Sequence, residues 1–529
     1  MLLVSRLSCT TKHLSCKLHN RRLLSTGSAN EIVEGSAKLL HTAEDPVFYN
    51  NIQGINRDMS IQVINLFSEV IETERKERSV ARPTGEQTQT ESDTVPESKR
   101  TGISVLEALA ATGLRSVRYM QEIPKIRTLV LNDLSAQATK TAHRTLAYNN
   151  IDMERVVIQN KDANDLMHAY KSQNDPFDVI DLDPYGSSAP FLDAAVQAVA
   201  GDGGLLCITC TDYATLCGVH SATSLGRYGT LNFPTGCKAE VALRTLLHAV
   251  DSAANRHQRY IVPWVSLSID YYVRVYVRVY KSKLEVKNSL LRRLMLYQAE
   301  DCPSFYTHAM GRLRNHPNKV PKPLVNVVTV PAVCEQTGGH WKIGGPFWGG
   351  PLHSQTVVDE LLERVKEASK YSSPAQYSPA DALAPTSELP NSQQTVETPA
   401  NETDSFINTS ELISPSTKAI HPIPTAKRLT GILMSMSLEL KDVPFFYSLP
   451  ELASAVQCKT PKYAQMEAAI TNAGYLVSNF HHDPNAVKTN APDVLVRVDT
   501  FCVLRLFFLP SIPNAYILIA NTCIFLIVC

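Results

Sequence analysis

Acidic residues follow three apolar runs in the first half of the chain. Asp133 follows the run RTLVLN, and Asp162 with Ala163 follows the run RVVIQNK. A third run lies within residues 177–196, which read FDVIDLDPYGSSAPFLDAAV. Unpaired carboxylates are costly to bury, so an acid at the end of such a run indicates either a helix cap or a ligand for a bound group. One acid alone is more often a cap, but acids at successive run ends favour a binding site.

These side chains suit a nucleoside that carries no pyrophosphate. An acid after the second strand of an open α/β sheet can accept hydrogen bonds from a ribose diol, which is the role we expect for Asp133. Asp162 and Ala163 are placed to contact an adenine amine. Gly113 follows an earlier apolar run, but no G-x-G-x-x-G motif accompanies it, so a dinucleotide cradle is poorly supported. The pattern favours S-adenosyl-L-methionine over NAD or ATP.

The loop DPYG at 183–186 has a role in the methylation of amines. A carboxylate that accepts hydrogen bonds from an exocyclic amine directs the nitrogen lone pair at a sulfonium methyl, while an aromatic ring stacks on the base. We therefore expect Asp183 to be catalytic, and Pro184 and Tyr185 to contact the substrate. Asp181 is either a further substrate contact or a brace for the loop.

Alternating strands and helices must position these residues. From residue 103 to about 210, apolar runs of strand length alternate with helical patterns, and RYIVPWVSLSIDYYVRVYVRVY adds two more strands. This order implies βαβ units, and hence an α/β fold with a parallel sheet covered on both faces. Ligands bind such sheets beyond the carboxyl ends of the strands, where the acids stand. Valines that alternate with Arg274 and Arg278 predict one solvent-facing side for the last strand.

Composition predicts a soluble protein of two or three domains, since the chain has 529 residues of which 19% are charged. The formal net charge is zero, so RNA binding would depend on local charge. Residues 238–322 carry more Lys and Arg than Asp and Glu, with tyrosines interleaved. This segment indicates either an RNA contact or a solvated strand face.

The N-terminal segment has a composition of its own. Residues 1–30 are basic and rich in serine, and the first acid is Glu31. That composition is typical of a mitochondrial transit peptide, although a merely disordered basic segment would look similar. A second pool in the nucleus or cytoplasm would follow from a downstream start such as Met59.

Three further segments depart from globular composition. Residues 75–101 are polar and lack aromatics, and residues 371–427 are rich in Ser, Pro and Thr, so both read as disordered insertions. The tail at 496–529 is atypically apolar and reads as a tail anchor, a buried segment or an altered C-terminus. Prolines interrupt it, and the remainder is shorter than the roughly 20 residues of a spanning helix. We expect no true membrane anchor.

Ordered motifs along the chain resemble those of the tRNA guanosine-26 dimethyltransferase family. The motifs include VLEALAATGLRSVRY, LNDLS, FDVIDLDPYGSSAPFLDAAVQAV, RYGTLNF and SIDYYVRVYVRV, and the family's N- and C-terminal signatures resemble VFYNNIQGINRDMS and HHDPNAVKTNAP. The resemblance covers about residues 31–365 and 428–495. It implies a Rossmann-like class I methyltransferase sheet with a second, family-specific α/β C-terminal domain. It also implies transfer of one or two methyl groups from S-adenosyl-L-methionine to N2 of guanosine 26 in tRNA.

The resemblance implies residue roles and domain limits. Arg57 in NRD and Arg115 in GLRS look like residues that hold the donor. The methyltransferase domain would occupy 31–270, and a tRNA-binding domain would combine 271–370 with 428–495. The roles expected above are matched at Asp133, Asp162, Ala163 and Asp183.

No metal site is expected. Some family members carry a cysteine cluster, but here Cys334 is followed by Thr337 where a second cysteine would complete a C-x-x-C motif, and one cysteine is too few for zinc. Cys207 and Cys210 fall on opposite faces of a predicted strand.

Two other functions stay open. One is a tRNA-binding relative with weak catalysis that acts on tRNA folding. The other is an amino-methyltransferase acting on another nucleic acid, although DNA is not the expected partner. The sequence predicts no oligomeric state.

Overall fold

The computed structural model describes most of the chain outside the N-terminal segment and the two insertions. The described residues are 30–41, 49–81, 101–316, 319–335, 337–370, 421–457, 459–496, 515–520 and 523–528. The predicted transit peptide therefore lies almost entirely outside the described residues, as do most of the two predicted insertions.

A seven-stranded sheet forms the centre of the molecule, with strand order β5-β4-β3-β6-β7-β9-β8. Strands β3 to β7 are parallel, and β9 runs antiparallel to both of its neighbours. The predicted Rossmann-like α/β class is thus confirmed. The strands are β3 (Ile103–Glu107), β4 (Ile126–Asn132), β5 (Val156–Gln159), β6 (Val179–Leu182), β7 (Asp202–Cys210), β8 (Arg259–Ile269) and β9 (Tyr272–Lys281).

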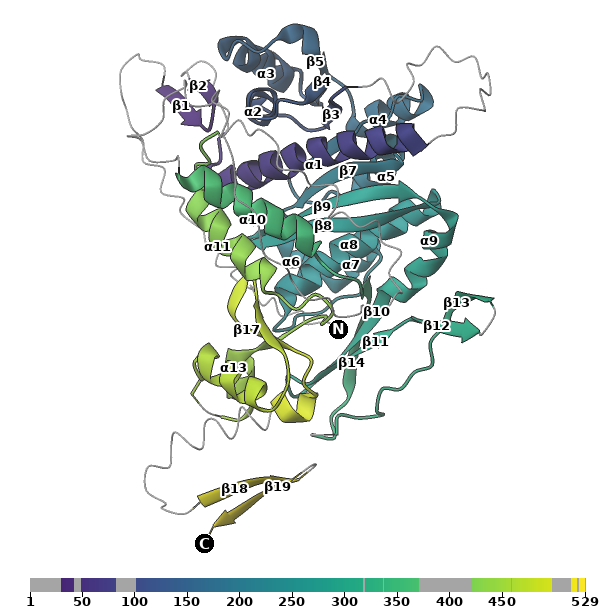
Figure 1. Cartoon of the computed structure of the whole chain (residues 1–529), viewed down its shortest axis with the longest axis vertical. Helices are drawn as coiled ribbons and strands as arrows, with labels where there is room; N and C mark the ends of the chain where they lie inside the picture. Colours follow the sequence, from purple (N-terminus) through teal and green to yellow (C-terminus); the bar gives the residue numbers. More distant parts are fainter. Residues whose placement is uncertain are drawn as a thin grey trace, which may run out of the picture.

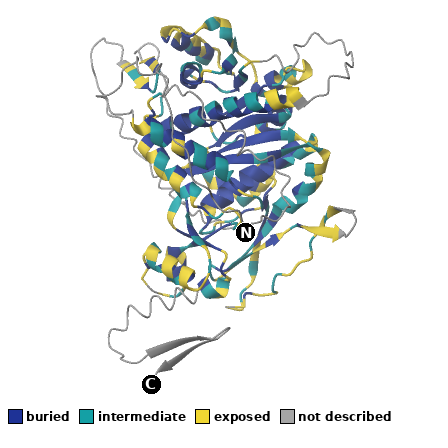
Figure 2. Ribbon diagram, viewed as in Figure 1, coloured by how far each residue is buried: buried dark blue, intermediate teal, exposed yellow. Residues whose placement is uncertain are grey.

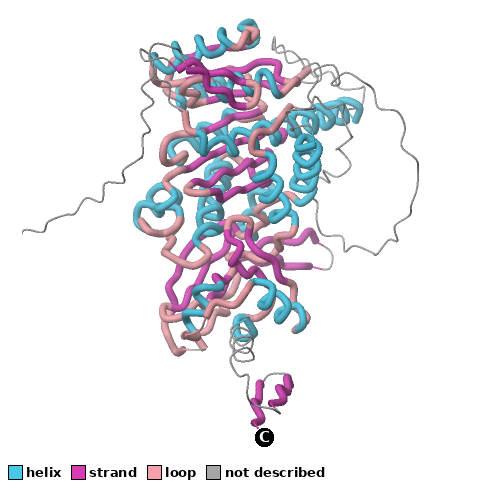
Figure 3. Tube along the Cα trace, turned by 90° about the vertical axis from the view of Figure 1, so that its left-hand side faces the viewer, coloured by secondary structure: helices cyan, strands magenta, loops and turns pink. Residues whose placement is uncertain are grey.

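Helices cover both faces of this sheet, with the strands between them (Figure 3). One face is covered by α1 (Gly54–Ala81), α2 (Leu114–Glu122), α3 (Ala136–Tyr148), α10 (Gln355–Lys370) and α11 (Ala426–Ser437). The other face is covered by α4 (Ala163–Ser172), α5 (Leu192–Ala198), α6 (Tyr213–Leu216), α7 (Ser221–Tyr228) and α8 (Lys238–Arg256). The sheet is accordingly buried almost throughout (Figure 2), as parallel strands with covered faces require.

The predicted solvent-facing side of β9 is wrong. Arg274 and Arg278 are both 0% exposed, and Tyr276 is buried beside them. This side of β9 faces α1, and Arg278 binds Glu74 of that helix at 2.8 Å. Alternation along a strand reports that successive side chains point to opposite faces, but it does not report whether a helix covers the polar face.

The opposite faces predicted for the C-x-x-C pair are confirmed. Cys207 packs in the core beneath α1 and α2, whereas Cys210 packs in the core beneath α5 and α8. The two thiols therefore cannot bind one ion together.

The first insertion begins later than predicted. Helix α1 continues to Ala81, so residues 75–81 belong to it. Arg75 binds Asp178 at the start of β6, and Arg78 binds Asp202 at 2.8 Å. These ion pairs attach a polar helix end to the sheet, which composition alone does not reveal.

The C-terminal part of the chain forms smaller sheets below the central one (Figure 1). Strands β11 (Phe305–Ala309), β10 (Arg293–Ala299) and β14 (Trp341–Trp348) form one sheet, and β12 (Gly311–His316) and β13 (Lys319–Val325) form an exposed hairpin. Helices α12 (Leu449–Ala455) and α13 (Tyr463–Asn472) pack with β15 (Tyr447–Ser448), β17 (Asp483–Thr489) and β16 (Val477–Phe480) in a small C-terminal unit. Other short elements include β1 (Asn30–Glu34), β2 (Ala37–His41), η1 (Asn51–Gln53) and α9 (Lys283–Asn288).

The division between the two predicted domains also differs in the structure. Helices α10 and α11 lie on the central sheet, where Leu361, Leu429 and Leu433 join the core beneath α1. The segment after the second insertion therefore returns first to the methyltransferase-like sheet and only then enters the small C-terminal unit.

In the apolar tail, the described residues form two short strands. Strand β18 (Ala515–Ala520) pairs with β19 (Cys523–Val528) in antiparallel register. Within the described residues, no helix combines the length and the apolar character needed to cross a membrane.

Candidate active site

The strand order reverses at β3, which has β4 on one side and β6 on the other. Open α/β sheets bind ligands at such a switch point, beyond the carboxyl ends of the strands. Glu107, the last residue of β3, pairs in register with Asp181 of β6. The acids predicted from the sequence stand at this same edge.

Four charged side chains from α2, β6, the loop after β6 and β9 meet there, and we call Arg115, Asp181, Asp183 and Arg274 the sheet-edge cluster. Arg115, in the first turns of α2, binds Asp183 through Nη2, and its Nη1 lies 3.5 Å from Asp181 Oδ2. Arg274 of β9 donates from Nη1 to Asp181 Oδ1 at 2.8 Å. Tyr119 donates its hydroxyl to the other oxygen of Asp181. Cations and carboxylates thus alternate from the core outward to Asp183.

Burial and charge set the protonation states within the cluster. Burial alone would raise the pKa of Asp181, but Arg274 and Arg115 outweigh it and the pKa is lowered. Burial raises the pKa of Glu107 to about 8, although Arg115 and a hydrogen bond from Ser116 oppose the shift. Glu107 is therefore largely neutral at neutral pH, and two guanidinium groups face two aspartates without excess charge.

The DPYG loop turns outward at the end of β6. Gly186 has φ +85°, a conformation that L side chains rarely adopt. Its N–H donates to Thr211 Oγ1 at 2.7 Å, and its carbonyl accepts the N–H of Thr211 at 2.7 Å. Pro184 is buried, whereas Tyr185 is 81% exposed. The loop is thus fixed at its base and presents an aromatic ring to the solvent.

Asp181 and Pro184 are both buried, and the substrate contacts expected for them stay predictions. Asp181 is 1% exposed and fully engaged by Arg274 and Tyr119, so the brace is the alternative that its geometry favours. Tyr185 remains placed for a substrate contact. Partial burial and the charges of Asp183 and Asp133 raise the pKa of Tyr185.

Asp133 joins the loops after β3 and β4. Its Oδ2 accepts the N–H of Ala111 at 2.9 Å, and its Oδ1 accepts that of Ser135 at 2.9 Å. Each carboxylate oxygen can accept a second hydrogen bond. Asp133 is therefore held at the switch point with acceptor capacity left for a ligand.

Asp162 is the N-cap of α4. Its Oδ1 accepts the backbone N–H groups of Asn164 and Asp165, at 2.8 and 3.3 Å. Within the described part of the chain, Oδ2 accepts no hydrogen bond. The cap and the predicted adenine contact are therefore compatible, and the adjacent Ala163 is only 3% exposed.

Arg57 lies outside the sheet-edge cluster. Its Nε donates to Glu34 Oε1 at 2.6 Å, and its Nη2 donates to the carbonyl of Asn50 at 2.9 Å. Arg118 binds the same Glu34 at 3.0 Å. The neighbouring Asn56 does reach the cluster, with Oδ1 3.5 Å from Arg115 Nη1. The donor role of Arg57 stays a prediction.

Sequence reasoning placed Arg274 in solvent and did not single out Tyr119, Ser60 or Glu107. Ser60 of α1 accepts from Arg115 Nη1 at 3.0 Å and from Arg274 Nη2 at 2.9 Å. One signal was available for Arg274. An aspartate inside a core strand requires a buried cation, and the alternating arginines of VRVYVRVY were candidates.

Comparison with known proteins identifies the family. The model for N2,N2-dimethylguanosine tRNA methyltransferases matches residues 27–377 and 404–498. The chain belongs to this family. The tRNA (guanine(26)-N(2))-dimethyltransferase of Mus musculus is 34% identical over 486 residues, which cover 87% of this chain and 65% of the relative. The chain thus spans about 65% of the length of that relative.

Two further relatives add a location and a fold. The Saccharomyces cerevisiae protein named "tRNA (guanine(26)-N(2))-dimethyltransferase, mitochondrial" is 31% identical over 489 residues, covering 88% of this chain and 77% of its own. Trm1 from Pyrococcus horikoshii, solved with S-adenosyl-L-methionine, has a TM-score of 0.63 at 24% identity, and the match covers 89% of this chain and 99% of that chain. The second likeness supports the methyltransferase fold with its C-terminal domain.

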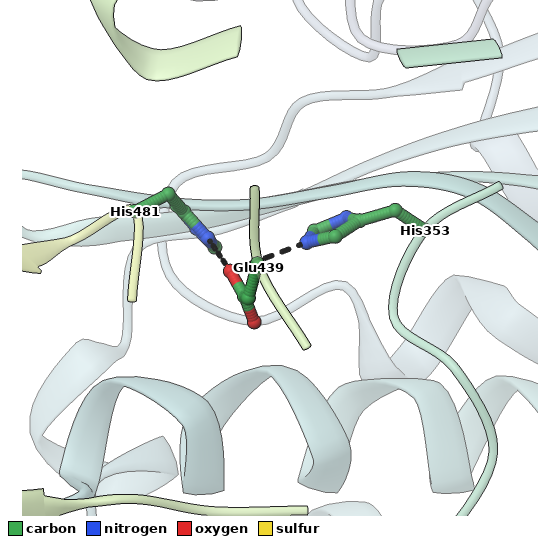
Figure 4. Close-up of side chains that lie close together, drawn as sticks. All are labelled: His353, Glu439 and His481. Atoms are coloured by element: carbon green, nitrogen blue, oxygen red, sulfur yellow. Dashed lines mark hydrogen bonds and ion pairs between the residues drawn. The ribbon is translucent and has the colours of Figure 1, made fainter. Parts of the chain in front are cut away.

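A second group of charged residues in this family member joins the central sheet to the C-terminal unit, and we call Glu240, His353, Glu439, His481 and Lys488 the interdomain cluster. Lys488 Nζ lies 3.0 Å from Glu240 Oε2 and 3.0 Å from Glu439 Oε1. His481 Nδ1 lies 3.1 Å, and His353 Nε2 3.7 Å, from Glu439 Oε2. Both imidazole rings point at this carboxylate (Figure 4). Sequence analysis missed the cluster because its members are scattered along the chain.

The two histidines and Glu439 have metal-ligand chemistry, and one buried nitrogen among them, Nε2 of His353, has no hydrogen-bond partner in the described structure. Nδ1 of His353 accepts the N–H of Ser266 at 3.2 Å, and Nε2 of His481 accepts that of Ser268 at 3.1 Å. The nitrogen that faces Glu439 on each ring is then the one that carries hydrogen. Lys488 also supplies a cation already. The absence of a metal site stays a prediction.

Cys334 has one thiol neighbour. Its Sγ lies 3.7 Å from that of Cys302, and the hydroxyl of Thr337 donates to Asp301 at 2.9 Å. In the described part of the chain, no further Cys, His or acidic side chain joins these two thiols in a group of metal-ligand spacing.

Proposed function

We propose that this chain transfers one or two methyl groups from S-adenosyl-L-methionine to the exocyclic N2 amine of guanosine 26 in tRNA. Family membership supports the reaction, as do the names of the relatives and the donor bound in the Trm1 structure. The observation that carries the proposal is the position of Asp183, at the end of β6 beside the switch point and at the open end of a buried charge cluster.

The donor would occupy the edge of the sheet between β3 and β5. Asp133 accepts hydrogen bonds from the ribose, and Asp162 with Ala163 meets the adenine. Arg115 and Arg57 supply positive charge for the donor's carboxylate. The unused Oδ2 of Asp162 and the second lone pairs of Asp133 fit this set, because an adenine amine and a ribose diol are both hydrogen-bond donors.

The guanine amine would meet Asp183. Arg115 binds Oδ2 of this residue, and no described residue donates to Oδ1, which is free to accept an N–H of the substrate amine. This hydrogen bond and the ring of Tyr185 orient the amine so that its lone pair points at the sulfonium methyl. The nitrogen forms the new C–N bond as the S–C bond breaks, S-adenosylhomocysteine leaves, and the amine then loses a proton.

The C-terminal domain would bind the tRNA. The β12–β13 hairpin exposes Arg312, Arg314 and Lys322, and Arg314 pairs in register with Lys322. Like charges directly opposite on paired strands are destabilising, and phosphates of an RNA backbone would relieve that repulsion. In this proposal α10 and α11 belong to the methyltransferase domain, because their apolar residues join the core beneath α1.

We assign the chain to the mitochondrion, with a nuclear or cytoplasmic pool as an additional location. The composition of residues 1–30 and the mitochondrial relative from S. cerevisiae support this assignment. A fluorescent reporter fused to residues 1–30 should enter mitochondria, and a reporter that stays in the cytosol would contradict the assignment.

One experiment tests the reaction directly. The full chain is incubated with labelled S-adenosyl-L-methionine and an unmodified tRNA transcript, and the RNA is digested to nucleosides. We expect N2-methylguanosine or N2,N2-dimethylguanosine at position 26, and none in a transcript with adenosine there. Binding without methyl transfer would indicate the tRNA-binding alternative. Label in DNA but not in tRNA would indicate a different amino-methyltransferase.

A further inference from the structure

A groove of about 840 Å³ opens beside the N-terminal end of α1. Three segments that are far apart in the sequence form it: η1 with the start of α1, the turn between β8 and β9, and the start of α11. The side chains that matter for its chemistry are Ile52, Ile55, Asp270, Tyr271, Lys427 and Arg428.

The groove lies at the same edge of the sheet as Asp183. Cys210, the last residue of β7, pairs with Val273 near the start of β9, so the β8–β9 turn lies beyond the carboxyl end of β7. Helix α1 links the two sites, because Ile55 lines the groove while Ser60 accepts from Arg115 of the sheet-edge cluster. The groove and Asp183 therefore lie along the same edge of the sheet and are joined by α1.

The walls of the groove combine an exposed ring with cations. Tyr271 is 82% exposed and Ile52 is 58% exposed, which gives one apolar wall. Arg428 of α11 binds Asp270, the neighbour of Tyr271 in the β8–β9 turn, at 2.7 Å. Lys427 is exposed, and no described acid pairs with it. The groove thus carries one positive charge in excess beside an aromatic platform.

The cationic wall is fixed in place. The N–H and hydroxyl of Thr425, just before α11, both donate to Asp58 Oδ2 of α1, at 2.9 and 2.6 Å. Asp58 is 1% exposed, and its other oxygen lies 2.7 Å from Arg118. Because α11 begins on a buried carboxylate, the backbone that carries Lys427 is fixed at the groove before any ligand arrives.

We propose that this groove binds one nucleotide of the substrate RNA close to the target guanosine, with its base stacked on Tyr271 and its phosphate at Lys427. Aromatic faces stack on any base, and a nearby cation neutralises the phosphate. The inference rests on the proposed function, since it takes RNA as the substrate. It adds a contact from the segment that follows the second insertion, on the methyltransferase sheet and not on the C-terminal unit.

The test compares Tyr271→Ala, Tyr271→Phe and Lys427→Gln in the full chain. Affinity for an unmodified tRNA transcript is measured by fluorescence anisotropy over a range of salt concentrations, and donor affinity is measured by calorimetry. Tyr271→Ala should weaken RNA binding about 5- to 150-fold, the range for loss of one base–aromatic stack, and Tyr271→Phe should retain it. Lys427→Gln should lower the salt slope of log affinity by about 1.

Matched controls are Tyr148→Ala and Lys140→Gln, which change exposed residues of α3 and should leave RNA affinity unchanged. Equal RNA affinity of Tyr271→Ala and wild type would overturn the groove proposal, as would weaker donor binding with unchanged RNA binding. The proposed function fails separately, if the wild-type chain does not methylate tRNA. Thermal melting of each variant shows that the affinities are those of folded protein.

Discussion

The sheet-edge cluster and the interdomain cluster are built from similar parts and differ in how they end. Each pairs buried carboxylates with buried cations: Arg115 and Arg274 bind the aspartates of the first, and Lys488 lies between the two glutamates of the second. In the sheet-edge cluster the last member, Asp183, has 25% of its side chain exposed. In the interdomain cluster, Lys488 has 1% of its side chain exposed, and Glu439 has 2%.

This difference separates structural from chemical roles for buried charge. A closed cluster whose charges are paired within it can fix two units relative to each other, but it presents no exposed atom to a substrate. A cluster with an open end holds its terminal group in one orientation and still offers an acceptor. Variants in the closed cluster should therefore change stability, and variants at the open end should change catalysis.

The largest effect is expected for Lys488→Met. The substitution leaves Glu240 and Glu439 buried without their shared cation, and breaking a buried ion pair costs about 3–5 kcal/mol. Urea unfolding of the full chain measures this loss. Lys441→Met, which changes an exposed lysine, serves as the control. A Lys488→Met protein as stable as the control would show that the cluster does not hold the two units together.

At the open end, Asp183→Ala should lower the rate of methyl transfer by roughly 10²-fold or more, because the amine loses the group that orients it. Donor affinity should persist, and the loss of stability should be smaller than in Lys488→Met since Asp183 is partly exposed. Single-turnover methylation and calorimetry measure the two quantities. Near-normal turnover would remove Asp183 from the catalytic role.

Arg115→Ala should weaken donor binding by about 1.5–3 kcal/mol, the range for a hydrogen bond to a charged group. Arg57→Ala is the informative companion, because Arg57 binds Glu34 and lies outside the sheet-edge cluster. If both variants weaken donor affinity in calorimetry, both arginines reach the donor. Unchanged affinity in Arg57→Ala with a lowered melting temperature would confine Arg57 to a structural role.

The smallest effect concerns the pH dependence of stability in the closed cluster. Burial lowers the pKa of His481 below its ordinary 6.5. As the pH falls, His481 therefore binds a proton at a higher pH in the unfolded chain than in the folded one. Lys488 and the two histidines outweigh burial and lower the pKa of Glu439 as well. His481 and Glu439 therefore each contribute to the free energy of unfolding in full at pH values above their pKa in the unfolded chain. Both contributions are lost as the pH falls.

Unfolding midpoints in urea at several pH values between about 7.5 and 5 should therefore fall toward acid. The His481→Gln variant should show a shallower fall over the part of this range below the ordinary histidine pKa of 6.5. An identical pH dependence in the two proteins would mean that His481 does not contribute to it.

The order of the elements and the loop at the end of β6 could be predicted from the sequence. Strand and helix periodicity, the acids at the run ends and the DPYG loop are local features, because each depends on residues that are neighbours in the chain. They predicted the parallel sheet and placed Asp133, Asp162 and Asp183 at its carboxyl edge, which the register of β3 with β6 brings together.

Which polar residues are buried was decided only by tertiary structure. Arg274 reads as a solvent-facing residue in its own strand, and it becomes a partner of Asp181 because α1 covers that face. The interdomain cluster unites residues as far apart in sequence as Glu240 and Lys488. A local pattern reports which side of a strand or helix a residue occupies, but what packs on that side, and so whether a charge meets water or another charge, depends on segments that are distant in the chain.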